Sequence, residues 1–149
     1  MDGIALSLGD VPLNLIEKHG LEDFIHERGG EREIRFLRRV RRPVLPVWYA
    51  GQLLIVPWGC RSGVLPRSRL TWLHTVEAGE WSRYSAESIT IPAALGLQGG
   101  VWFRIRQGIR GLLVEEPEVA AYLIVEPASH YYRVMTRCER MPVLVGERI

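Results

Sequence analysis

The sequence predicts a single α+β domain, residues 1–149, with an antiparallel β-rich core. Short runs rich in β-branched and aromatic residues alternate with Gly- and Pro-containing turns along most of the chain. Helical periodicity is confined to residues 11–27, so we expect a few short helices, mainly near the N-terminus. Strands do not alternate with long helices, and no phosphate-loop or dinucleotide fingerprint is present. These observations argue against a doubly wound nucleotide-binding fold.

The individual elements follow from local patterns. Gly20 interrupts the helical spacing of residues 11–27, which predicts two short helices or one broken helix. Two hairpins are predicted, from 44–49 and 52–56 around Ala50-Gly51, and from 101–105 and 109–114 around Gln107-Gly108. Further strands are predicted at 70–76, 88–91, 122–125 and 143–145.

Arginine dominates the basic residues of this chain. There are 18 arginines and one lysine, Lys18, and the net charge is +2. Six arginines lie between residues 32 and 42, with no acid after Glu33: Arg32, Arg35, Arg38, Arg39, Arg41 and Arg42. The planar guanidinium group suits phosphate recognition, so the cluster is either a nucleic-acid-binding patch or an ordinary solvated face.

The number and spacing of the cysteines indicate the cellular compartment and argue against a metal site. Cys60 and Cys138 are too few for a disulfide scaffold and do not have metal-ligand spacing with the four histidines. We therefore expect a reducing, cytoplasmic location, no metal and no other cofactor. No apolar run approaches the ~20 residues of a membrane span, and the N-terminus lacks a signal-peptide pattern, so we expect no membrane partner. The oligomeric state does not follow from the sequence.

The segment 138–144 is the most unusual stretch of the chain. Cys138, Glu139 and Arg140 place a thiol, a carboxylate and a guanidinium side by side. Pro142 then excludes a helix, and an apolar run begins. Polar groups at the point where a loop enters a buried strand often belong to a functional site.

Arg140-Met141-Pro142-Val143 resembles, residue for residue, the Arg-Met-Pro-Val that follows His-Asp near the end of SOS-response-associated peptidase (SRAP) proteins. Weaker similarities to this family run in the same order along the chain. They lie at Met1-Asp2-Gly3, Arg35-Phe36, 43–47, Trp58-Gly59, 74–80, Pro92 with 99–103, and 125–128.

The resemblance implies a barrel-like, β-rich SRAP domain with a basic cleft and a role in the SOS response to DNA damage. SRAP proteins act on abasic sites in single-stranded DNA. Their N-terminal cysteine captures the open sugar aldehyde, and its amine and thiol together close a thiazolidine ring. An Asn, a Glu and the His of the closing motif support this chemistry.

This chain departs from the family at each of these positions. Asp2 replaces the cysteine, His74 stands near the Asn position, Cys138 replaces the His, and residues 100–103 contain no acid. A thiazolidine needs an amine and a thiol on one residue, so we expect the crosslinking chemistry to be lost or altered. Whether the protein is an enzyme stays open.

The family-site positions are Met1, Asp2, His74 and Cys138. The Met1 α-amine ordinarily titrates near ~7.7–8.0 and can form an imine with an aldehyde; an ordinary frayed terminus is the alternative. Cys138 lies between arginines and is either a reactive thiol or a relic of the lost histidine.

Single-stranded or abasic DNA is the partner we expect. The candidate DNA-binding residues are Arg35, Arg38, Arg39, Trp58, Arg137 and Arg140. Trp58 either stacks on an unpaired base or packs in the core. Two other functions stay open: a non-catalytic structural or interaction module on the same fold, and a hydrolase that depends on Cys138.

Overall fold

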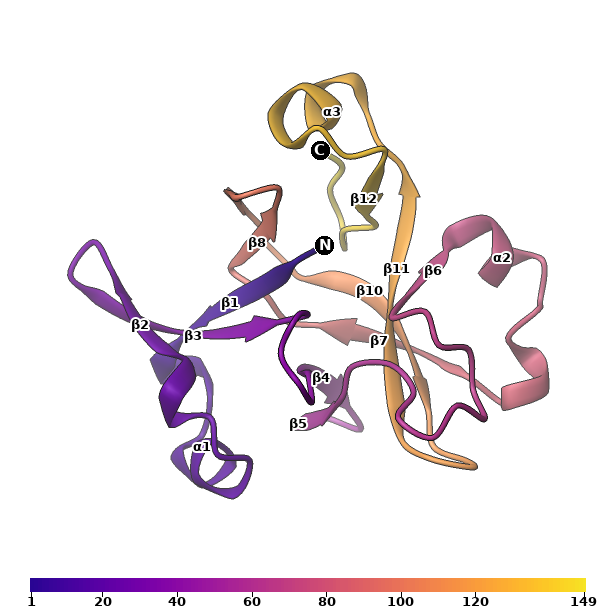
Figure 1. Ribbon diagram of the computed structural model, residues 1–149, viewed down its shortest axis with the longest axis horizontal. Coiled ribbons are helices and arrows are strands. Elements are labelled where there is room, and N and C mark those ends of the chain that lie inside the picture. Colours follow the sequence, from indigo (N-terminus) through magenta and orange to yellow (C-terminus); the bar gives the residue numbers. More distant parts are fainter.

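Two β-sheets form the framework of the protein in the computed structural model, which describes residues 1–149 (Figure 1). The first sheet has five antiparallel strands in the order β2-β3-β1-β8-β9. Their bounds are Gly3–Ser7 (β1), Ile25–Arg28 (β2), Glu31–Leu37 (β3), Leu95–Gln98 (β8) and Val101–Arg104 (β9). β1 lies at the centre of this sheet, and its first four residues are buried.

The second sheet contains seven strands. Six of them follow the order β12-β11-β10-β7-β4-β5, and β6 pairs in parallel with β11. Their bounds are Val44–Tyr49 (β4), Gln52–Pro57 (β5), Leu70–Trp72 (β6), Glu87–Ile91 (β7), Ile109–Val114 (β10), Ala120–Pro127 (β11) and Arg140–Pro142 (β12). The first six residues of β11 are all buried, which accounts for its continuous apolar run.

Alternate side chains of β11 belong to two different parts of the core. Leu123 and Val125 pack in the main core together with Ile4 of β1. Tyr122 and Ile124 pack in a smaller cluster around Trp81. The second sheet is therefore covered on one face by the first sheet and on the other by residues of the segment 60–86. Each large apolar side chain buried this way stabilises the fold by about 1.5–3 kcal/mol.

Three short helices lie outside the sheets: α1 (Leu13–Lys18), α2 (Leu73–Glu77) and α3 (His130–Thr136). α3 begins at Ser129, whose hydroxyl accepts a hydrogen bond from the backbone N–H of Tyr132 at 3.1 Å. It ends at Arg137, which has a φ of 59°. In Figure 1, α3 and β12 lie above and beside the N-terminus, which places the closing motif near residue 1. No helix combines the length and apolar character needed to cross a membrane.

The β-rich α+β class is confirmed, and so is the hairpin of β4 and β5. Its two turn residues, Ala50 and Gly51, have φ values of 52° and 77°, which match the right-handed twist of the strands. Gly20 follows α1 with a φ of 61°, and a separate 3₁₀ turn begins at Glu22, so the predicted interruption is present.

Several fold predictions are wrong. No closed barrel forms, because the outer strands β2, β9, β12 and β5 have no partner that closes either sheet. The helices are not mainly N-terminal, since α2 and α3 lie in the middle and near the end of the chain. The predicted strand 70–76 ends at Trp72, where α2 takes over.

The second predicted hairpin is also wrong. β9 pairs with β8 around Gly99 and Gly100, whose φ values of 58° and 78° make a tight hairpin turn. β10 pairs with β7 and β11 in the other sheet. Residues 105–108 therefore connect the two sheets. Gly99-Gly100 was a stronger hairpin signal in the sequence than Gln107-Gly108.

Candidate functional site

The first two residues lie between elements from distant parts of the sequence. The backbone N–H of Asp2 donates to the carbonyl of Leu97 at 2.8 Å, and the N–H of Arg38 donates to the carbonyl of Asp2 at 2.9 Å. Met1 is only 3% exposed. Its sulfur accepts a hydrogen bond from the Tyr132 hydroxyl at 3.8 Å, so α3 closes over the start of the chain. Hydrogen bonds and burial therefore hold the N-terminus in place, and it is not a frayed end.

Strand register places three polar side chains in one row. Gly3 pairs with Leu37 on β3 and with Leu97 on β8, so Asp2 lies opposite Arg38 on one side and Gln98 on the other. Directly opposed residues in antiparallel strands project from the same face of the sheet. Asp2 is held there by the backbone N–H of Gly99 at 3.0 Å and by the Arg38 guanidinium at 3.5 Å.

This row contains the two buried side-chain polar atoms in the structure that have no hydrogen-bond partner. They are Nε of Arg38 and Oε1 of Gln98. A buried polar group without a partner costs about 1–3 kcal/mol, so such atoms are rare in folded proteins. A donor and an acceptor are thus left unpaired on either side of Asp2.

The α-amine of Met1 has an unusual pKa. Burial lowers its pKa from 8.0 to about 6. Asp2 and Cys138 oppose this shift, while the positive charges of Arg38 and Arg140 add to it. Most of the amine is therefore neutral at pH 7, which is the form that attacks a carbonyl carbon. The cluster formed by Met1, Asp2, Arg38, Cys138 and Arg140 is called the N-terminal cluster below.

Tyr132 adds an aromatic wall to the N-terminal cluster. Its side chain is fully buried and packs edge-on against Phe103, with ring centroids 5.6 Å apart. Burial, followed by the nearby Cys138 and Asp2, raises the pKa of its hydroxyl well above the ordinary value. Sequence reasoning missed both Tyr132 and Gln98. The capping serine Ser129 ahead of 130–136 was the available signal for the helix that places Tyr132.

Cys138 lies directly after the left-handed residue Arg137 that ends α3, and it is half-buried. Its backbone N–H donates to the Thr136 hydroxyl at 3.3 Å, whereas its thiol makes no hydrogen bond. Glu139 is exposed and pairs weakly with Arg133 at 3.8 Å. No histidine or carboxylate is thus hydrogen-bonded to the Cys138 thiol as a general base.

The structure brings together only some of the predicted site residues. Asp2, Arg38, Cys138 and Arg140 all lie near enough to the Met1 amine to act on its pKa. Arg39 and Arg137 are exposed. Arg35 lies apart from them: it pairs with Glu33 at 2.8 Å and contacts the Trp102 ring at 5.1 Å.

Two predicted site residues are placed differently from expectation. His74 is exposed on α2 and stacks on Trp72 at 5.6 Å, with no hydrogen bond or ion pair to the N-terminal cluster. Trp58 is 2% exposed, and its indole N–H donates to the carbonyl of Arg69 at 3.1 Å. A ring buried to this extent cannot stack on a base, so core packing is the correct alternative for Trp58.

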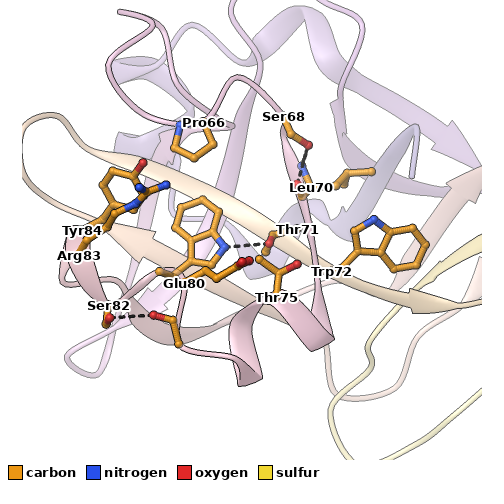
Figure 2. A pocket seen from close by; sticks show the side chains of 12 residues that line it. Pro66, Ser68, Leu70, Thr71, Trp72, Thr75, Glu80, Ser82, Arg83 and Tyr84 are labelled. Atoms are coloured by element: carbon orange, nitrogen blue, oxygen red, sulfur yellow. Dashed lines mark hydrogen bonds between the residues drawn. The ribbon is translucent and has the colours of Figure 1, made fainter.

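The largest cavity, about 610 Å³, lies beside β6 and α2 and contains none of the predicted site residues. Figure 2 shows Thr75 and Glu80 between Trp72 on one side and Tyr84 with Arg83 on the other. Trp81 forms the buried wall of this cavity, and its indole N–H donates to the hydroxyl of Thr71 at 2.8 Å. The cavity is open to solvent and is structurally separate from the row of Arg38, Asp2 and Gln98.

Comparison with models of known protein families, with curated proteins and with solved structures finds no match to this chain. No group of three or more potential metal-ligating side chains comes together in the structure. The structure is that of an α+β protein in which a largely neutral amine is enclosed near two arginines, a carboxylate and a thiol.

Proposed function

We propose that the protein binds single-stranded DNA around the N-terminal cluster and that the aldehyde of an abasic site is the group recognised there. The resemblance to the SRAP family motivates the substrate. The observation that carries the proposal is the convergence of Met1 and Asp2 with Cys138 and Arg140, which lie at opposite ends of the chain. Met1, Asp2 and Cys138 are three of the four positions that the family resemblance assigns to one site; the fourth, His74, lies elsewhere on α2.

The charges around the amine support an anionic ligand. Arg38 and Arg140 lie close enough to lower the pKa of the amine, and Arg39 and Arg137 are exposed next to them in sequence. Guanidinium groups neutralise phosphates and release counterions, which is the main sequence-independent source of DNA affinity.

The chemistry of this site differs from a thiazolidine crosslink. Met1 is 3% exposed, so a strand reaches its amine only when α3 moves away from the start of the chain. The neutral Met1 amine then attacks the aldehyde carbon of the open sugar, a C–N bond forms, and the carbonyl oxygen leaves as water to give an imine. Loss of a proton from the neighbouring carbon then expels the 3′-phosphate and breaks the strand. Asp2 is the nearest carboxylate and is the group we expect to accept this proton. Met1 bears the amine but no thiol, so no ring closes and the adduct stays reversible.

Salt-dependent binding tests the DNA part of the proposal. The logarithm of the affinity for a single strand is expected to fall linearly with the logarithm of salt concentration, with a slope of about −0.7 per phosphate contact. Arg140→Gln is expected to weaken binding and to reduce this slope by about that amount. Arg104→Gln is the matched control, because Arg104 is exposed on β9 and makes no ion pair. Flat or absent binding at low salt contradicts the proposal and favours the non-catalytic module.

Borohydride trapping tests the chemical part. Reduction of the imine on an abasic oligonucleotide is expected to fix the protein to DNA through the Met1 peptide, identified by mass spectrometry. Adding two residues before Met1 is expected to abolish trapping while DNA binding persists. Trapping at Lys18 instead, the one lysine of the chain, shows that the N-terminal cluster is not the reacting site. Hydrolytic activity lost in Cys138→Ser with unchanged DNA binding favours the hydrolase.

A further inference from the structure

A cavity of about 480 Å³ opens between the turn after β3, the end of β5 and the loop that follows β5. It shares no lining residue with the N-terminal cluster or with the 610 Å³ cavity. Its lining contains Pro43, Trp58 and Cys60 together with four arginines: Arg41, Arg42, Arg61 and Arg69.

Arg69 is fixed in this wall by three separate contacts. Its carbonyl accepts the indole N–H of Trp58 at 3.1 Å, and its guanidinium donates to the carbonyl of Arg38. Its aliphatic stem crosses Gly59, where a Cβ atom would come within 2.7 Å of Arg69 Cγ. Gly59 also has a φ of 81°, a conformation that glycine adopts without strain. The absence of a side chain at Gly59 therefore leaves room for the Arg69 side chain to lie across the backbone there.

None of the four arginines forms an ion pair. The five ion pairs of the structure all involve other basic residues. The carboxylate tied to this loop, Glu118, instead accepts hydrogen bonds from the Cys60 thiol at 2.8 Å and the Ser62 hydroxyl at 2.6 Å. Four like charges around one cavity repel one another, and none of the four guanidinium groups has a carboxylate within ion-pair distance.

We propose that this cavity binds a phosphate group. A phosphate presents two negative charges and several acceptor oxygens, so it can be held by more than one guanidinium fork at once. A single carboxylate offers one charge and one bidentate face, which leaves most of the arginines unpaired. The volume lies within the ~300–1,000 Å³ range of small-molecule sites, so the phosphate can carry an organic group. A free phosphorylated molecule and a nucleic-acid backbone share this chemistry.

The proposal does not rest on the proposed function of the N-terminal cluster. No residue lining this cavity is among Met1, Asp2, Arg38, Cys138 and Arg140. Loss of imine trapping at Met1 therefore leaves this proposal intact, and loss of phosphate binding leaves the imine chemistry intact.

Cys60 provides a reporter of occupancy. Cys60 is half-buried and lines the cavity, so an occupant is expected to reduce the access of a neutral alkylating reagent to its thiol. Alkylation of Cys60 by iodoacetamide is followed by mass spectrometry of its peptide, which separates it from Cys138. Inorganic phosphate replaces chloride at constant ionic strength, so that general screening does not change. Phosphate in the millimolar range is expected to slow alkylation of Cys60 and to raise the melting temperature.

Variants of the exposed lining arginines test the assignment. Arg42→Gln and Arg61→Gln are each expected to weaken phosphate protection by about tenfold, as the loss of a charge-assisted hydrogen bond does. Arg104→Gln removes the same charge from outside the cavity and is expected to behave like the unmodified chain. Circular dichroism confirms that each variant is folded. Equal effects in all three variants, or no protection by phosphate in the unmodified chain, overturn the proposal.

Two further ligands identify the source of the phosphate. Tighter binding of pyrophosphate than of a single-stranded oligonucleotide, lost in Arg61→Gln, assigns the cavity to a free phosphorylated molecule. Tighter binding of the oligonucleotide, competed by phosphate and lost in the same variant, assigns it to a strand backbone. Either result supports a phosphate site at these arginines.

Discussion

The reactivity of the Met1 amine gives the sharpest test of the N-terminal cluster. A pKa of about 6 leaves roughly nine-tenths of the amine neutral at pH 7, whereas the ordinary value of 8.0 leaves roughly one-tenth. The enclosed amine therefore presents about ten times more of its reactive form at neutral pH than an ordinary N-terminus does. Reductive alkylation by a small aldehyde measures this directly.

The assay follows the rate of alkylation from about pH 5 to about pH 9, spanning the pKa values at issue. Mass spectrometry resolves the Met1 peptide from Lys18, which is exposed and serves as the internal reference for the reagent. We expect the Met1 profile to have its midpoint at about pH 6.

Two substitutions are expected to move this midpoint in opposite directions. Arg38→Gln removes a positive charge that lowers the pKa of the amine, so the midpoint is expected to rise. Asp2→Asn removes a negative charge that raises it, so the midpoint is expected to fall. A midpoint near 8 in the unmodified chain, or a shift of both variants in the same direction, would refute the reasoning.

The same pKa shift makes the stability of the fold depend on pH. Between pH 8 and pH 6 the unfolded chain takes up a proton on this amine, whereas the folded chain does not. The free energy of unfolding therefore falls as the pH is lowered through this window, by about 3 kcal/mol in total. Acetylation of the amine is expected to remove this part of the pH dependence in urea unfolding. An unchanged slope after acetylation contradicts the assignment.

Two further predictions concern the framework. Thr71→Val keeps the shape of the side chain but leaves the buried indole N–H of Trp81 without an acceptor, and it is expected to lower the free energy of unfolding by about 1–3 kcal/mol in urea titration. Gly59→Ala is expected to cost about 1–2 kcal/mol of backbone strain plus the displacement of Arg69, because both the φ of 81° and the 2.7 Å approach oppose a side chain. Gly30→Ala is the control. The φ of Gly30 is 83°, but no atom lies within 4 Å of the added Cβ, so this substitution incurs only the backbone strain. Equal losses at 59 and 30 would show that the Arg69 contact is unimportant.

Local patterns predicted the parts of this fold that depend on neighbouring residues. Ala50-Gly51 indicated a hairpin because a two-residue turn requires positive φ at both positions. The uninterrupted apolar run 122–125 indicated a strand, and β11 is buried on both faces. Gly3–Ser7 was not recognised as a strand, since a short apolar run does not reveal its period.

The candidate site was predicted only in part, for a different physical reason. Asp2 and Cys138 were singled out from opposite ends of the chain, and the structure places both beside the Met1 amine. Gln98 carries no sequence signal, because its role follows from the pairing of β8 with β1. The grouping of His74 with these residues came from collinear similarity alone, and α2 holds it elsewhere.

The sequence by itself determined that this is a β-rich, arginine-rich protein and that residue 2 cannot supply the thiol for a thiazolidine. These properties depend on residue identity and local spacing, which the chain states directly. The tertiary structure alone decided that the first residue is enclosed, that its amine has a pKa of about 6, and that four unpaired arginines share one cavity. The burial of a group and its distance from other charges depend on which strands pair. That pairing is set by contacts between residues far apart in the chain.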